Sequence, residues 1–105
     1  MSWKRTEYVL RLSGEDRYRH VHVRSGNRIT YFRLQLETRL GGRWQAVVRY
    51  DTAHGFAHRD LLNRCGHMRK TPLFNMDYNE CLTFAENDLK ANWQDYKRHF
   101  LEAER

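Results

Sequence analysis

The sequence predicts an α+β fold in which an antiparallel β-meander sheet packs against one long C-terminal α-helix. Much of the chain between residues 7 and 51 alternates apolar and polar side chains with a period of two, which is typical of strands. Short segments rich in glycine, serine, asparagine and aspartate separate these stretches and predict tight turns. After residue 77 the apolar side chains recur three and four residues apart, as on one face of a helix.

The length and charge of the chain bound the classes of protein it fits. Its 105 residues suit a single domain, and we expect the sheet over roughly residues 6–72 and the helix over roughly 77–102. The net charge of +6 favours polyanionic partners, above all nucleic acid. No secretory leader, membrane-length apolar run or cysteine framework is evident. We therefore expect a cytoplasmic protein with no membrane partner and no cofactor.

The first two predicted strands cover residues 7–12 and 17–24, with turn-forming residues between them. In the second strand His20 and His22 share one face, because side chains two apart in a strand point the same way. Such a pair suits either metal chelation or a solvated strand face. We favour the solvated face, because no third ligand stands nearby.

The third and fourth predicted strands cover residues 29–39 and 43–51 and form a hairpin. A two-residue loop at 41–42 would place Arg49 opposite Leu34 and bring charge to the apolar face. A three-residue loop at 40–42 places Val48 opposite Leu34, and Gly42 suits the left-handed position that ends such loops. A shift of one residue reverses every side chain, so we predict the three-residue loop. This register also sets Arg33 opposite Arg49 on the other face, where an anion between them would relieve their repulsion.

Two short strands and the helix complete the predicted fold. The strands cover residues 56–63 and 68–71, and Pro72 ends the second of them. Asp77 and Glu80 form a capping box that predicts the start of the helix. Its apolar face carries Leu82, Ala85, Leu89 and Trp93, and we expect it to pack on a sheet face formed by Phe32, Leu34, Leu36, Trp44 and Val48.

Groups that move protons or hold anions are concentrated between residues 49 and 60. Cleavage of RNA through its own 2′-hydroxyl needs a base, an acid and a cation for the phosphate. Histidine fills either proton role near neutrality, and arginine donates two hydrogen bonds to phosphate oxygens. We predict a catalytic set of His54, His58, Asp51 and Arg49, in which Asp51 or Asp60 orients an imidazole.

The nucleic-acid-binding residues that we predict are basic side chains of the predicted sheet, namely Arg33, Arg49, Arg59, Arg69 and Lys70. Two other interpretations of the histidines stay open. Asp51, His54 and His58 are suitable metal ligands across a strand–turn–strand. Alternatively, both histidines only cap strand ends through hydrogen bonds.

Residues 49–55, Arg-Tyr-Asp-Thr-Ala-His-Gly, followed by His58-Arg59-Asp60, resemble a short segment of TumE-like proteins. These are small toxin components of bacterial and archaeal toxin–antitoxin pairs. Thr52 stands where the family is expected to have asparagine, and Asp60 stands in place of a second histidine. The resemblance implies a toxin that acts on RNA or translation and has a cognate antitoxin protein as its partner.

The sequence thus leads to two hypotheses from different classes. The first is a small toxin-like protein that acts as a metal-independent ribonuclease. The alternative is a non-catalytic basic module that binds nucleic acid or protein through the same residues. The two differ in whether His54 and His58 reach a common phosphate position.

Overall fold

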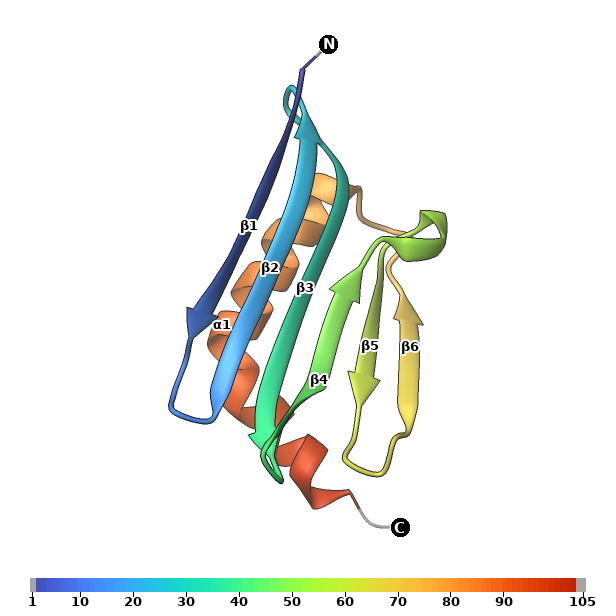
Figure 1. The fold of residues 1–105 in the computed structure, drawn as a ribbon. Helices are drawn as coiled ribbons and strands as arrows, with labels where there is room; N and C mark the ends of the chain where they lie inside the picture. Colours follow the sequence, from blue (N-terminus) through green and yellow to red (C-terminus); the bar gives the residue numbers. More distant parts are fainter. Residues whose placement is uncertain (1, 104–105) are drawn as a thin grey trace.

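The computed structural model describes residues 2–103, which form a six-stranded antiparallel sheet and one long helix (Figure 1). The strands lie in the sheet in their order along the chain: β1 (Trp3–Arg11), β2 (Asp16–Ser25), β3 (Arg28–Leu40), β4 (Arg43–Asp51), β5 (His58–Leu62) and β6 (Met68–Pro72). A short 3₁₀ turn, η1 (Ala53–Gly55), joins β4 to β5, and the helix α1 (Tyr78–Glu102) follows β6. The predicted α+β fold is confirmed, although the sheet begins at Trp3 rather than near residue 6.

The helix α1 starts at the predicted capping box. The Asp77 carboxylate accepts the Glu80 N–H at 2.8 Å, and the Glu80 carboxylate accepts the Asp77 N–H at 3.2 Å. Two otherwise free N–H groups of the first turn are satisfied in this way. The side chains that α1 buries are Cys81, Leu82, Ala85, Leu89 and Phe100, whereas Trp93 is only half-buried.

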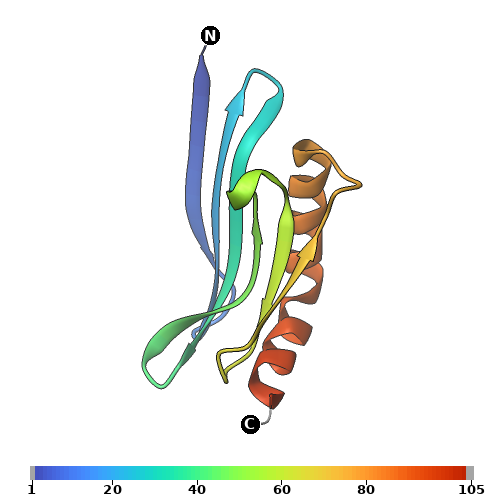
Figure 2. The ribbon, with the colours of Figure 1, turned by 90° about the vertical axis from the view of Figure 1, so that its right-hand side faces the viewer.

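The helix covers one face of the sheet and leaves the other face free of secondary structure (Figure 2). We call the second one the open face. Beneath α1 lie Phe32, Leu34 and Leu36 of β3 with Val48 and Tyr50 of β4, all of them buried. The hydrophobic effect of this single apolar layer is what fixes the helix on the sheet.

The predicted register of the β3–β4 hairpin is wrong. The turn has two residues, Gly41 and Gly42, and both adopt positive φ angles, 63° and 76°. Two successive left-handed residues are what a two-residue hairpin turn requires, and glycine adopts them without strain. Arg49 nevertheless does not stand opposite Leu34, because a β-bulge at Val47 shifts the pairing by one residue between the turn and the core.

The bulge changes which side chains face the helix. Beyond it Leu36 pairs with Val48 and Leu34 with Tyr50, so the apolar residues meet on the helix side. Before it Trp44 turns to the open face, where the Arg17 guanidinium lies 4.0 Å from the centre of its ring. Trp44 is therefore not part of the core under α1, contrary to the prediction.

No helix formed by residues 2–103 is long and apolar enough to cross a membrane.

The burial of α1 yields a test in which one type of substitution is made at two places. Phe100→Ala should lower the free energy of unfolding by about 3–5 kcal/mol, because Phe100 is 1% exposed in the core. Phe84→Ala, on the same helix but 46% exposed, should lower it by less than about 1.5 kcal/mol. Urea denaturation of both variants measures the difference. Equal losses would contradict the packing of α1 described above.

Candidate active site

The candidate site is built around a histidine and an aspartate on β5. His58 and Asp60 are two residues apart on one strand, so both side chains lie on the open face. The His58 Nδ1 is 3.1 Å from the Asp60 Oδ1, and both residues are buried. The Lys70 Nζ also lies 3.3 Å from Nδ1, but it donates over the shorter distance of 3.0 Å to Asp60. A carboxylate accepts hydrogen bonds and does not donate them, so we assign the proton to Nδ1. The remaining ring nitrogen, Nε2, then carries a lone pair, which is the property that a base or a ligand atom requires.

Cations from both neighbouring strands balance the buried Asp60 carboxylate. Arg49 stands opposite Asp60 on β4, with its guanidinium 3.7 Å from Oδ2. Lys70 stands opposite on β6, and its Nζ is 3.0 Å from Oδ1. A buried carboxylate needs such partners, because a single unpaired charge inside a protein is costly. Arg49 and Lys70 are thus both held within reach of the His58 ring.

The His58 Nε2 is buried and has no hydrogen-bond partner among residues 2–103. Buried polar atoms without partners are uncommon in folded proteins, and each one calls for an explanation. Two rings lie close to the His58 ring. The centre of the His54 ring lies 6.0 Å from that of His58, with the two planes only 30° apart, and the Phe56 ring lies at 5.5 Å.

His54 itself is exposed and has a strained backbone. Its φ angle is 72°, in the left-handed region that few residues other than glycine adopt. Gly55 follows with a φ of 84° and continues the sharp turn of η1. Strain of this kind persists where the surrounding contacts impose it, and it is frequent at functional sites. Here it holds an exposed imidazole over a buried one.

Asp51 shapes the turn and makes no hydrogen bond to an imidazole of residues 2–103. Its carboxylate accepts the Ala53 N–H at 2.5 Å and lies 3.6 Å from the Arg33 guanidinium. It stands opposite His58 in the sheet, but the carboxylate bound to the His58 ring belongs to Asp60. Of the two acids considered from the sequence, Asp60 is therefore the one that orients the imidazole.

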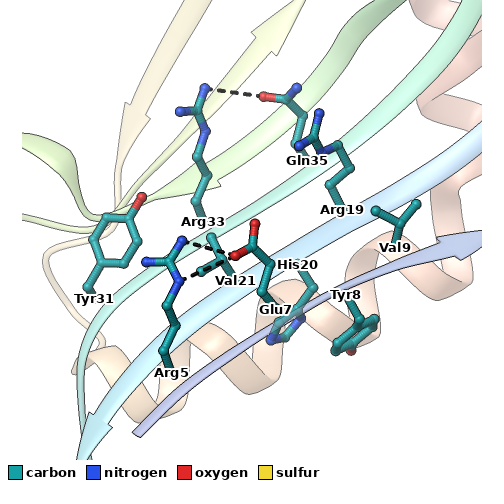
Figure 3. A pocket seen from close by; sticks show the side chains of 10 residues that line it. All are labelled: Arg5, Glu7, Tyr8, Val9, Arg19, His20, Val21, Tyr31, Arg33 and Gln35. Atoms are coloured by element: carbon teal, nitrogen blue, oxygen red, sulfur yellow. Dashed lines mark hydrogen bonds and ion pairs between the residues drawn. The ribbon is translucent and has the colours of Figure 1, made fainter. Parts of the chain in front are cut away.

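The predicted Arg33–Arg49 pair does not form. Arg33 stands opposite Asp51, and Arg49 donates to Gln35 at 2.7 Å. Toward β1, the open face carries a hollow of about 330 Å³ whose polar lining includes Arg5, Glu7, Arg19, Arg33 and Gln35 (Figure 3). The open face thus presents a band of cations from β1 to β6, interrupted by carboxylates that pair with several of them.

Two of the predicted binding residues lie on the other side of the sheet. Arg59 stands opposite Tyr50 and contacts the Tyr96 hydroxyl at 3.4 Å, on the helix side. Arg69 stands opposite Leu61 on that same side. Neither of them joins His58, Arg49 and Lys70. The alternation of side chains along a strand separates Arg59 from His58 and Arg69 from Lys70.

A family model described as a domain of unknown function, DUF7718, matches residues 1–105. The chain belongs to this family. No curated protein and no solved structure matches it. The resemblance of the DUF7718 chain to TumE-like toxins accordingly remains a prediction.

The DUF7718 chain also contains a buried hydrogen-bonded relay on the helix side of β2. The Tyr18 hydroxyl lies 2.5 Å from the His20 Nδ1, and the His20 Nε2 lies 2.7 Å from the His22 Nδ1. Tyr8 stacks on His20 with ring centres 4.6 Å apart. The solvated face expected for this pair is wrong for His20, which is 3% exposed. Its burial, with the nearby charges of His22 and Lys90, lowers the pKa of His20 to about 4.

Metal binding finds no support in the arrangement of the DUF7718 side chains. Within residues 2–103, no three or more histidine, cysteine, aspartate or glutamate side chains are grouped so that they could hold a metal ion. The set of Asp51, His54 and His58 is included in this finding.

The lowered pKa of His20 predicts how stability depends on pH. Between pH 6.5, the ordinary pKa, and pH 4, the unfolded chain binds a proton at His20 that the folded chain does not. The stability contributed by neutral His20 should therefore be complete above that window and be lost as the pH falls through it. Urea denaturation at pH 7, 5.5 and 4 should show a steeper loss for the parent than for His20→Asn, which does not titrate. Parallel curves would contradict the burial of a neutral His20.

Proposed function

We propose that this protein is a small toxin-like ribonuclease that cleaves RNA without a metal ion at His54 and His58. One observation carries the proposal: Asp60 orients the His58 ring through Nδ1, Nε2 has no hydrogen-bond partner among residues 2–103, and a second imidazole, that of His54, lies with its ring centre 6.0 Å from that of His58. A carboxylate that fixes an imidazole in this way is the arrangement used by catalytic triads. The surrounding cations then stabilise the negative charge of the phosphate.

The reaction follows from the proton roles of the two rings. The His58 Nε2 takes the proton of an RNA 2′-hydroxyl, and the 2′-oxygen attacks the adjacent phosphorus. The bond from phosphorus to the 5′-oxygen breaks, and protonated His54 donates its proton to that leaving oxygen. The products are a 2′,3′-cyclic phosphate and a free 5′-hydroxyl. Asp60 stabilises the charge that develops on the His58 ring.

The cations of the open face serve the crowded phosphate of the transition state. Arg49 and Lys70 stand next to the His58–Asp60 pair. Arg33 lies on β3, beside Asp51 of β4. Guanidinium groups bind two phosphate oxygens at once and keep their charge throughout the reaction. Arg33 is half-exposed and so is free to reach a bound strand of RNA.

Access to the base requires one movement. Because Nε2 is buried, a 2′-hydroxyl reaches it only after a local movement, and the exposed His54 ring, with its centre 6.0 Å from that of His58, is the neighbour that we propose to move. His54 sits on an exposed turn of three residues, and its strained backbone lowers the cost of leaving the present conformation. Substrate binding would thus bring the acid into position and uncover the base in the same step.

The toxin assignment and its antitoxin partner are supported by the resemblance of residues 49–60 to TumE-like proteins and by the net charge of +6. An acidic antitoxin would bind the cations of the open face through charge complementarity.

A second candidate function is a non-catalytic module that binds RNA or protein on the same face. It is favoured by the burial of His58 and by the ion pairs that tie Arg49 and Lys70 to Asp60. In that case His58 is a structural residue and only the exposed cations contact the ligand.

Replacement of the two histidines tests catalysis directly. His58→Asn keeps a donor near the Nδ1 position for Asp60 but lacks Nε2, and His54→Ala removes the other proton carrier. Each should reduce RNA cleavage about 10²–10⁴-fold, the usual effect of losing one proton-transfer group. His67→Ala, at an exposed histidine in the β5–β6 turn, should cleave like the parent. Circular dichroism checks that all three variants fold.

Cleavage that persists in both His54→Ala and His58→Asn would contradict the proposed roles. Loss of cleavage in EDTA, with recovery on adding a divalent ion, would contradict a metal-free reaction. No cleavage by the parent, together with tight RNA binding, would favour the non-catalytic module.

Salt dependence tests which face of the sheet holds the phosphates. Arg33→Ala and Arg49→Ala should each weaken binding to single-stranded RNA and lower the slope of log K against log salt by about 0.7, one phosphate contact. Arg69→Ala removes the same charge from the helix side and should leave the slope unchanged. Fluorescence anisotropy at several salt concentrations measures it. Equal effects of all three variants would contradict binding at the open face.

A further inference from the structure

The strand β1 is an unprotected edge of the sheet. Within residues 2–103 it pairs only with β2, along all nine of its residues, and its other side has no partner strand. Seven large hydrophobic side chains of the described chain are exposed, and four of them are on β1: Trp3, Tyr8, Val9 and Leu10. A long regular edge strand with exposed apolar side chains is a template for pairing with another chain.

The opposite edge of the same sheet has the features that prevent such pairing. β6 has only five residues, ends in Pro72 and carries Arg69 and Lys70. Short length, proline and charge are the usual devices that block edge-to-edge association. β1 is nearly twice as long, has neither proline nor bulge, and carries charges of both signs, including Arg5 and Glu7, whereas the charges of β6 are all positive. The two edges therefore differ in the way expected if only β1 is an interface.

The hydrogen-bonding direction of β1 follows from its turn with β2. The Leu12 N–H donates to the Asp16 carbonyl at 3.0 Å, so the backbone groups of Leu12 point toward β2. These groups alternate along a strand, and the β1–β2 register is uninterrupted. The groups that point to the free edge are consequently those of Trp3, Arg5, Glu7, Val9 and Arg11.

We propose that two copies of this chain associate through β1, antiparallel and centred on Thr6. In this register Arg5 of one copy faces Glu7 of the other, twice across the two-fold axis, and both are exposed residues. Trp3 faces Val9, and Lys4 faces the Tyr8 ring. Opposite charges, apolar pairs and facing threonines are the cross-strand pairs that stabilise antiparallel sheets.

The neighbouring registers are less favourable. Only residues whose backbone groups point to the free edge of β1 can exchange hydrogen bonds between the two copies. The neighbouring registers that meet this condition place the two-fold axis one residue away from Thr6, at Arg5 or at Glu7. Centring on Glu7 places two glutamates face to face, and centring on Arg5 places two arginines face to face. Like charges directly opposite each other destabilise a sheet. The order of charges along β1 thus selects Thr6 as the centre.

Such a pairing joins the two sheets into one. Facing residues of paired strands share a face of the sheet, so the open faces of both copies form one surface. The helices lie together on the other side and leave β1 free to pair (Figures 1 and 2). Both His58 sites then open on the same side, whether or not they cleave RNA.

Charge reversal tests the pairing. The parent should sediment as a dimer, twice the 12.8 kDa mass of one chain. Arg5→Glu and Glu7→Arg should each weaken the dimer about tenfold, because two attractive pairs become repulsive. An equimolar mixture of the two variants should recover a dimer that contains one copy of each, because opposite charges face each other again. The contact between Arg5 and Glu7 within each chain is lost in both variants and is not restored by mixing.

Disulfide capture tests the register. In a Cys65→Ser background, Thr6→Cys should form a dimer on mild oxidation, because facing residues at this position have Cα atoms about 4.5 Å apart, within disulfide range. Thr83→Cys, at an exposed threonine of α1, should not. A parent that sediments as a monomer up to millimolar concentration would overturn the proposal and leave β1 to an extended segment of another protein. Mixed variants that stay monomeric, or equal oxidation of both cysteine variants, would overturn the register.

Discussion

The β-bulge at Val47 is the constraint on which the rest of the structure depends. It allows one strand to serve two purposes, because side chains on either side of it have opposite orientation. Before the bulge Trp44 faces the open side, whereas beyond it Val48 and Tyr50 face α1. Arg49 and Asp51 are thereby turned to the open face. Without the extra residue, either the core or the site would lose its share of β4.

The open face is organised as rows of charges that run across the strands. One row joins Arg33, Asp51 and His58, and the next joins Gln35, Arg49, Asp60 and Lys70. Each buried carboxylate has a cation within 4 Å, so neither acid is left unpaired. Removing one partner of such a pair costs more than the pair contributes, since the remaining charge stays buried. The same ion pairs limit how many cations are free for a ligand.

Both faces of the sheet carry a buried histidine with hydrogen-bonded partners. The relay from Tyr18 through His20 to His22 lies on the helix side of the sheet, next to the apolar core, and this burial lowers the pKa of His20. The His58–Asp60 pair lies on the open face near cations. The two buried histidines therefore differ in environment: His20 has both ring nitrogens hydrogen-bonded, whereas His58 has a partner only at Nδ1 among the described residues.

The sequence by itself determined the features that depend on local periodicity. Alternation predicted the strands, and the capping box of Asp77 and Glu80 predicted the start of α1. Only the tertiary structure decided the bulge at Val47, because its position reflects how the β3 and β4 faces bury together. The partnership of Asp60 with Lys70, the helix-side position of Arg59 and the burial of His20 likewise depend on which strands become neighbours and on where α1 packs. These are contacts between residues distant in sequence, and no local pattern encodes them.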